Sequence, residues 1–527
     1  MSKQLDSGSS LREKLVNGAN VLQEYVSCTL GPRGQNVIIK DKERRPVITK
    51  DGVTVAKNLS LSDPVENLAV DVIKQASAKT NVDAGDGTST STVIACAILN
   101  YAQSHIASSV NPVHIKRGLD VVTEAICAEL EVLAKPISSL SQIADIASIS
   151  ANNDDVLGAL IADAVSKVGK DGSITVEEAR SLETTLDLVE GFRFDSGYCA
   201  TAFITDDRRG TVNYEEPIFL LTDYKLETVD QILPTLEIAS RESRPLVIVA
   251  DDIEGQALAA LIMNAIRGTM KVAAVKAPRY GEERRNIMDD LSLSVGAKYF
   301  RRSAGDDLRT VSLTDFGQAK SIEISKSLTT IVGGTSNHNL IDDRITALKE
   351  EVSAAESLPA AERIQERITR LASGIAVVRV GGATEIEVVE RRHRIEDALE
   401  AVRSAQQEGI LPGGGTSLLK VLHRVTRSSD EVPSNVDAAQ KILKSALEEP
   451  FRMMSNNAAV DFDVESMLQQ ILEDQEFEVG YDFYNKGLTN MLEAGIIDPA
   501  KVLRCALQNA VSAAGTLITT NHAIIEN

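Results

Sequence analysis

The hydrophobic periodicity of the chain changes twice, and this order limits the folds that the chain can adopt. Apolar residues recur at helical spacing in the first part of the sequence, over residues 11–30, 65–80, 92–109 and 113–134. In the middle, short apolar strands alternate with helical segments, which is typical of an α/β region. From residue 386 to the end, the spacing is mainly helical again. The sequence therefore predicts a multidomain fold with helical ends around an α/β middle.

The elements of the middle can be placed individually. Strands are expected at 173–176, 185–189, 218–222, 245–250, 272–276 and 374–382, and helices at 228–241 and 254–268. Residues 339–372 carry many charges and apolar residues at helical spacing, and Leu358-Pro359 divides them into an expected antiparallel pair of helices. Near the N-terminus, residues 36–40 and 46–49 predict two short strands.

Length and composition narrow the classes of protein. A chain of 527 residues suggests about three domains. Its net charge of -21 disfavours nucleic acids and anionic membranes as partners. The 5 cysteines are scattered without a CxxC pair and the 6 histidines are isolated, which argues against a disulfide framework or a zinc site. No secretory h-region and no run of 18 apolar residues is present, so a cytoplasmic protein is expected.

One stretch, residues 84–92, has the composition of a phosphate-binding loop. Two glycines flank Asp86, a run of Ser and Thr follows, and an apolar helical segment comes next. A helix N-terminus presents unpaired N–H groups and partial positive charge to an anion. Asp86 offers a hard oxygen that suits Mg²⁺. The alternative is a helix N-cap run that binds no ligand.

Further glycine-rich segments lie elsewhere in the chain. The first helix ends in the segment TLGPRG, residues 29–34, and residues 409–415 form a glycine-rich loop. A tight turn is expected at Lys50-Asp51-Gly52. Two acids have simpler explanations: Asp498 before Pro499 suits a helix N-cap, and Asp397 suits a solvated helix face.

Taken together, the motifs resemble one family. The order TLGPRG, TKDG, AGDGTSTST, ISANND, VEGFRFDSGY, VKAPRYG, ATEIE, RIEDAL, LPGGGTSL and AGIIDPAKV is similar to that of group I chaperonins of the GroEL type, from about residue 11 to residue 520. The resemblance implies a helical equatorial domain (1–133 and 409–527), a small intermediate domain (134–190 and 375–408) and an α/β apical domain (191–374). Gly191 and Gly374 match the hinge glycines of the family.

The resemblance also implies the site residues. Asp51 and Asp397 would align or activate the attacking water in ATP hydrolysis, and Asp86 would bind Mg²⁺; K⁺ is a further cation that the family allows. The expected ATP contacts are Thr29, Leu30, Gly31, Pro32, Lys50, Asp86, Gly87, Thr88, Ser89, Thr90, Gly414 and Asp498. Asp397 belongs to the intermediate segment, so its approach to the nucleotide would couple hydrolysis to domain movement.

Substrate binding is assigned in the same way. The family positions that bind unfolded chains match Tyr198, Ala202, Phe203, Leu233, Leu236, Leu258, Ile262 and Met263. An exposed apolar groove would capture non-native proteins through the apolar surface that they expose. Periodicity alone favours the alternative for Leu233, Leu236, Leu258 and Ile262, namely that they face the core. Implied partners are unfolded proteins, a GroES-type co-chaperonin lid and copies of the chain itself in a heptameric or double heptameric ring.

The sequence departs from the family at several positions. Tyr481-Asp482-Phe483-Tyr484-Asn485 stands where the family has Tyr-Asn-Ala-Ala-Thr next to adenine. Ala202 replaces an aromatic residue of the substrate groove, and Ser196 replaces an Arg that pairs with an acid matched by Glu385. The Gly-Gly-Met-rich tail of the family is also replaced. A divergent paralogue is one interpretation of this pattern.

Three functions remain open on the sequence. The first is an ATP-hydrolysing folding machine, favoured by Asp51, Asp86 and Asp397. The second is a holdase or interaction protein with weak or no ATPase cycling, suggested by residues 481–485 and Ser196. The third, an unrelated phosphotransferase, is disfavoured because the sequence contains no GxxxxGK[ST] motif.

Overall fold

The structure is a computed structural model that describes residues 3–40, 46–108, 110–168, 174–179, 181–335, 338–353, 363–364, 367–368, 370–371, 374–427 and 434–526. The chain divides into two compact units. The first unit comprises Met1–Ser166, Val176–Thr185 and Arg379–Asn527, and the second comprises Lys167–Thr175 and Leu186–Val378. The three-domain division expected from the motifs stays a prediction.

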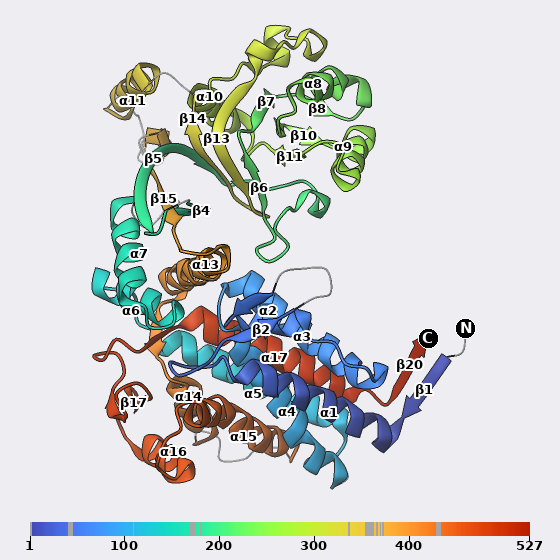
Figure 1. Cartoon of the computed structure of the whole chain (residues 1–527), viewed down its shortest axis with the longest axis vertical. Coiled ribbons are helices and arrows are strands. Elements are labelled where there is room, and N and C mark those ends of the chain that lie inside the picture. The colour runs from blue at the N-terminus through green and yellow to red at the C-terminus, as the bar shows by residue number, and fades with distance from the viewer. Residues whose placement is uncertain are drawn as a thin grey trace. The chain divides into compact units, whose positions relative to one another are not determined.

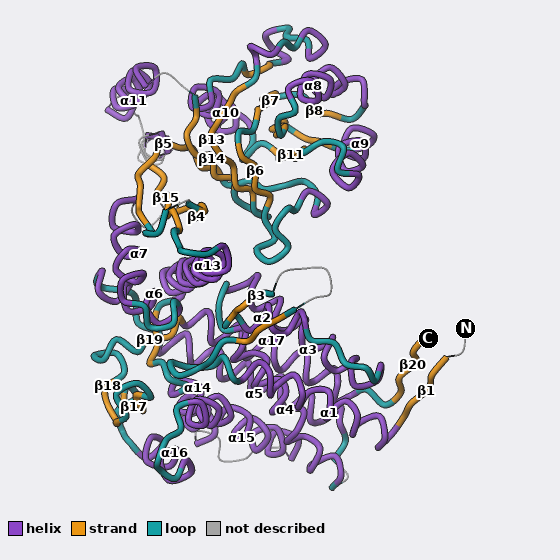
Figure 2. The backbone as a smooth tube through the Cα atoms, in the orientation of Figure 1, coloured by secondary structure: helices purple, strands orange, loops and turns teal. Residues whose placement is uncertain are grey.

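The first unit is built mainly from helices (Figure 2). They are α1 (Gly8–Ser27), α2 (Gly52–Asn58), α3 (Pro64–Ala84), α4 (Thr88–Ala107), α5 (Pro112–Leu133), α6 (Leu140–Ser150), α7 (Asp155–Val168), α13 (Glu385–Glu408), α14 (Thr416–Arg427), α15 (Ser434–Asn457), α16 (Val464–Glu473) and α17 (Ala500–Thr519). Short strands pair antiparallel as β1 (Lys3–Ser7) with β20 (His522–Glu526), β2 (Val37–Ile39) with β3 (Val47–Thr49), β16 (Ile410–Pro412) with β19 (Ile497–Pro499), and β17 (Val479–Asp482) with β18 (Gly487–Asn490).

The two ends of the chain share one hydrophobic core. Helix α17 packs on α3, α4 and α5, although more than 360 positions separate it from them in the sequence. Helix α4 is buried on nearly all sides, because every residue from Ser91 to Leu99 is buried. Strands β1 and β20 lie side by side near the termini (Figure 1). Cys96 and Cys127 are buried in this core, as their apolar context predicts.

The second unit contains a mixed sheet with helices. The strands of the sheet, most of which lie in the second unit, follow the order β11 (Val272–Lys276), β9 (Leu246–Ala250), β7 (Ile218–Thr222), β13 (Gly317–Ile324), β14 (Thr329–Gly334), β5 (Thr185–Phe194), β15 (Gly374–Val380), β4 (Ile174–Glu178), with β12 (Tyr299–Phe300) on β7 and β6 (Val212–Glu215) on β13. Further elements are η1 (Thr201–Phe203), β8 (Lys225–Leu226), α8 (Val229–Glu242), β10 (Asp252–Ile253), α9 (Gly255–Arg267), α10 (Gly281–Val295), η2 (Arg302–Ala304), η3 (Leu308–Thr310), η4 (Leu313–Asp315) and α11 (His338–Ser353).

The α/β expectation holds for the parallel part of this sheet. Strands β7, β9 and β11 pair in parallel, and helices α8 and α9 connect them. Ile218–Thr222 and Leu246–Ala250 are buried at every position, which explains why these segments read as continuous apolar runs. The helix α11 forms the first half of the expected helical pair, and the second half lies partly outside the described residues.

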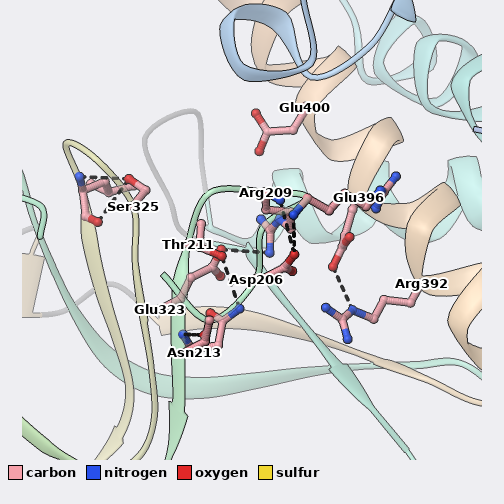
Figure 3. Close-up of polar contacts among 12 residues, drawn as sticks. Asp206, Arg209, Thr211, Asn213, Glu323, Ser325, Arg392, Glu396 and Glu400 are labelled. Atoms are coloured by element: carbon pink, nitrogen blue, oxygen red, sulfur yellow. Dashed lines mark hydrogen bonds and ion pairs between the residues drawn. The ribbon is translucent and has the colours of Figure 1, made fainter. Parts of the chain in front are cut away.

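Polar contacts of Asp206 and Arg209 hold the segment before β6. Before β6, the Asp206 carboxylate accepts hydrogen bonds from the backbone N–H groups of Arg208 and Arg209, and the Arg209 guanidinium pairs with Glu323 at 2.8 Å (Figure 3).

Among the described residues, no helix has the length and apolar character needed to cross a membrane.

Candidate nucleotide site

A cavity of about 540 Å³ lies in the first unit. Segments far apart in the sequence line it, from the end of α1 to the strand before α17. Every residue expected to contact ATP or to act in hydrolysis is in this lining: Thr29, Leu30, Gly31, Pro32, Lys50, Asp51, Asp86, Gly87, Thr88, Ser89, Thr90, Asp397, Gly414 and Asp498. The expectation that Asp51 and Asp86 share one cavity is therefore met by the geometry.

The N-terminus of α4 opens onto the cavity. Its N-cap residue is Gly87, at φ +77°, which offers no side chain to bond the first N–H groups of the helix. The run of Ser and Thr is itself the first turn of the helix, which starts at Thr88 rather than near residue 92. The partial positive charge of this helix end is thus directed at the space where a phosphate would lie.

Asp51 is held rigidly by the helix that follows it. Its carboxylate caps α2, accepting from the N–H of Val53 at 3.1 Å, from the N–H of Thr54 at 3.2 Å and from the Thr54 hydroxyl at 2.6 Å. The expected tight turn at Lys50-Asp51-Gly52 is therefore the start of a helix. Gly52 packs on the first turn of α4, since a Cβ there would lie 2.2 Å from the Ser89 hydroxyl oxygen.

Asp86 and Asp498 are two further carboxyl groups in the cavity, and the charge of Asp86 acts on Asp498. The Asp86 carboxylate accepts from the Gly87 N–H at 2.5 Å and from the Ser150 hydroxyl at 2.9 Å. Burial nevertheless raises the pKa of Asp86, and Asp51 contributes in the same direction. Burial and the charge of Asp86 raise the pKa of Asp498 to about 7. Among the described residues, no cluster of three or more His, Cys, Asp or Glu side chains forms a ready metal site, so Asp86 as a ligand of Mg²⁺ stays a prediction.

The raised pKa of Asp498 predicts how the stability of the fold depends on pH. An Asp carboxyl ionises near pH 3.9 in an unfolded chain, whereas Asp498 keeps its proton up to about pH 7 in the fold. Stability without ligand should therefore fall between about pH 4 and pH 7, because only the unfolded state gains the charge. We expect Asp498→Asn to raise Tm at pH 7.5 and to leave it unchanged at pH 4, measured by thermal unfolding without nucleotide. A Tm gain of equal size at both pH values would contradict this.

Asp498 does not cap a helix. It lies in β19, where it pairs with Leu411 of β16, and α17 begins two residues later at Ala500 with Pro499 as its N-cap. The strand pairing places its carboxyl beside the glycine-rich loop, since a Cβ on Gly413 would lie 3.1 Å from the Asp498 Oδ1 atom. The simpler explanation of Asp498 from the sequence is thus wrong.

Lys50 is a cation in the lining of the cavity. Its ammonium group donates to the Gly31 carbonyl at 3.2 Å. Burial lowers the pKa of Lys50 to about 8, and the nearby Arg394 acts in the same direction. A phosphate beside Lys50 would compensate for this loss of solvation.

Asp397 is partly buried and also lines the cavity. Its helix α13 packs on α6 and on α17, both in the first unit. The alternative of a freely solvated acid on a helix face is therefore wrong for this conformation.

The turn after α6 also lines the cavity, although it was not among the residues expected to contact ATP. Ser150, Asn152 and Asn153 line the cavity, and both asparagines have left-handed backbone conformations, φ +65° and +60°. The motif ISANND contained the signal, because asparagine tolerates this conformation and polar side chains cluster there. Arg394 was not among the expected contacts either; its guanidinium pairs with Glu390 at 2.6 Å and lies 3.6 Å from Asp154.

The divergent segment 481–485 forms the tip of the β17–β18 hairpin at the cavity wall. The Phe483 ring is 3 % exposed and packs 4.9 Å from the Phe451 ring and 5.1 Å from the Tyr481 ring. The core therefore accommodates a phenylalanine at a position where the family has alanine. Tyr484 is 56 % exposed and lies under the Arg33 guanidinium at 5.3 Å.

The residues expected to bind unfolded chains lie in the second unit with unequal exposure. Leu233 on α8 and Met263 on α9 are each 45 % exposed, and Tyr198, Ala202, Leu258 and Ile262 are partly buried. Phe203 and Leu236 are buried, at 1 % and 8 % exposure. The expectation that these two lie on an open surface is wrong, because both side chains pack into the core of the second unit.

Ser196, where the family has an Arg, bonds within the second unit. Its hydroxyl donates to the Lys276 carbonyl at 2.5 Å, and its own carbonyl accepts from the Thr329 hydroxyl at 2.7 Å. The serine thus has a local structural role in this chain.

Comparison with known proteins identifies the fold and the family. The chain is similar to a crystal structure of the chaperonin gp146 from the bacteriophage EL 2 (Pseudomonas aeruginosa), with a TM-score of 0.66 and 21% sequence identity over 99% of each chain. That protein was crystallised in the presence of ATP-BeFx. The model of the TCP-1/cpn60 chaperonin family matches residues 22–527. The resemblance of the motifs and the expected fold class are thereby confirmed, and the chain belongs to the TCP-1/cpn60 chaperonin family.

Proposed function

We propose that this chain is an ATP-driven molecular chaperone that binds non-native polypeptides and releases them through cycles of Mg-ATP hydrolysis. The carrying observation is that the 14 residues expected for ATP binding and hydrolysis line one cavity of about 540 Å³. Family membership supports the chaperone function, and the crystallisation of gp146 with ATP-BeFx supports nucleotide binding.

The residues of the cavity divide the work of phosphoryl transfer. The N–H groups at the start of α4 and the ammonium of Lys50 would hold the phosphates. Asp86 and the neighbouring hydroxyls would hold Mg²⁺, which supplies the positive charge that neutralises the phosphate oxygens. Asp51, fixed by its three donors, and Asp397 would orient the attacking water and accept its proton.

The polypeptide site would lie on helices α8 and α9, which contact each other. Leu233 and Met263 expose 45 % of their surface and Ile266 exposes 66 %. Apolar side chains in this state gain about 25 cal/mol for each Å² that a bound chain covers, which favours any protein with exposed apolar segments. A homo-oligomeric ring and a co-chaperonin lid belong to the same proposal through the family.

Polypeptide capture can be tested with one double variant. Replacing both Leu233 and Met263 with serine should abolish most suppression of client aggregation, measured by light scattering of a chemically denatured client, because two anchors of the surface become polar. Leu313→Ser is the matched control, since Leu313 is 42 % exposed in the same unit but lies in η4. Equal suppression by the double variant and the control would refute the assigned surface.

The same samples decide between the two chaperone hypotheses. Mg²⁺-dependent ATPase activity together with suppression supports the folding cycle. Suppression without any ATPase activity would instead select a holdase.

A further inference from the structure

The turn between α3 and α4 lies in very close contact with helix α13. Gly85 ends α3 with φ +74°, and its N–H donates to the Asn81 carbonyl at 2.9 Å. A Cβ atom on Gly85 would lie 2.1 Å from the Cβ and 2.7 Å from the Cγ of Glu400. The same atom would lie 3.4 Å from the Glu400 Cα. The turn therefore accepts α13 at this distance only because residue 85 has no side chain.

A hydrogen bond joins the same two elements. The Ser404 hydroxyl donates to the Ala84 carbonyl at 2.9 Å, and Ser404 is only 3 % exposed. This bond satisfies a carbonyl at the end of α3 that has no partner within its own helix. Residues 397, 400 and 404 are spaced three and four apart, so Asp397, Glu400 and Ser404 share one face of α13.

The charged side chains of Arg392, Glu396 and Glu400 on α13 form ion pairs. Arg392 pairs with Glu396 at 2.9 Å and with Glu178 at 3.0 Å, and Glu400 extends apart from the Arg392–Glu396 pair (Figure 3). Glu400 pairs with Arg403 at 2.6 Å on its own helix. Two contacts thus join this face to the α3–α4 turn: the Cα, Cβ and Cγ atoms of Glu400 lie against Gly85, and the Ser404 hydroxyl donates to the Ala84 carbonyl.

We propose that Ala84 and Gly85 form the docking site that sets the position of Asp397 relative to Asp86. Gly85 and Ser404 are then positioning residues for ATP hydrolysis, and this inference rests on the proposed function. The reason is geometric: Asp86 follows Gly85 directly, and Asp397 lies one turn before Glu400. A change in the spacing between the turn and α13 therefore moves the two acids apart.

The test is Gly85→Ala. The added Cβ should push α13 away and lower kcat by about 10²-fold, the usual cost of displacing a reacting group by about 1 Å. KM for ATP should change little, because the added Cβ of residue 85 would meet Glu400 of α13, and Gly85 is not among the expected ATP contacts. Gly305→Ala is the matched control: it has the same φ of +74° at a helix end, and no atom lies within 4 Å of the added Cβ.

Rescue variants separate docking from a general structural fault. Gly85→Ala combined with Glu400→Gly should recover the kcat of Glu400→Gly alone, because the two nearest atoms, the Glu400 Cβ and Cγ, are removed and the Glu400 Cα lies at 3.4 Å. Gly85→Ala combined with Glu400→Ala should not recover, since the Cβ at 2.1 Å remains. Ser404→Ala should lower kcat less, with KM again little changed.

Hydrogen exchange provides a readout that does not depend on hydrolysis. Amides of residues 394–404 should exchange faster in Gly85→Ala than in the wild-type chain or in Gly305→Ala. Normal exchange and normal kcat in Gly85→Ala, or failure of Glu400→Gly to rescue, would overturn the inference. A wild-type chain without Mg-ATPase activity would overturn the proposed function instead, and faster exchange in Gly85→Ala would still support the docking contact.

Discussion

Replacing Asp397 with alanine should reduce kcat for ATP hydrolysis by about 10³-fold while leaving ATP binding intact. A side chain that accepts or orients a proton in the transition state contributes about 10²- to 10⁴-fold to the rate. Asp397 lines the cavity from α13, together with Asp51 and the N-terminus of α4. The substitution removes one of the acids proposed to act on the attacking water and leaves Lys50 and the α4 N–H groups in place. ATP binding should therefore survive.

The measurement is steady-state ATPase activity together with ATP-induced stabilisation in a thermal unfolding assay. Glu385→Gln is a suitable control, because Glu385 lies on the same helix and does not line the cavity. Asp397→Asn tests the charge separately, since its shape is the same. Full activity of Asp397→Ala would show that this acid has no part in hydrolysis.

Replacing Asp86 with asparagine should change stability in opposite directions with and without nucleotide. Without nucleotide, Tm at pH 7 should rise, because burial and Asp51 disfavour the charged carboxylate. With Mg-ATP, the ligand-induced stabilisation should disappear, which at a ligand concentration of 100 Kd amounts to about 2.7 kcal/mol. Hydrolysis should be lost with it, because the proposed metal ligand is gone.

The control for this effect is already present in the cavity. Asp498 lines the same cavity, and the charge of Asp86 contributes to its raised pKa. In Asp86→Asn the pKa of Asp498 should therefore fall, and the pH-dependent loss of stability should shift to lower pH. Unchanged Mg-ATP stabilisation in Asp86→Asn would exclude Asp86 as the metal ligand.

Local features of the sequence were sufficient for many elements. Residues 218–222 and 246–250 are apolar except for Thr222, and the structure buries all ten in parallel strands. The periodic segments of α3, α4 and α5 form helices within a few residues of the expected limits. Such signals are reliable because they depend on contacts each residue makes with one face of its own element.

Other features could not be obtained locally. Asp498 has every local sign of a helix cap, yet the pairing of β19 with β16 places it in the cavity. Asp51 has the sequence of a tight turn, yet it caps α2. Leu236 and Leu233 stand three residues apart on one helix, but only the packing of α8 against the core of the second unit decides that Leu236 is buried and Leu233 exposed.

The sequence by itself determined the family and the identity of the groups that could hold a nucleotide, because motifs preserve residue types at fixed spacing. Only the tertiary structure decided that these groups meet. The cavity needs the ends of α1 and α3, the start of α4, the strand β19 and helix α13, and these elements come together because α17 and α13 pack on the N-terminal helices. That packing depends on apolar contacts between residues hundreds of positions apart, which no local pattern encodes.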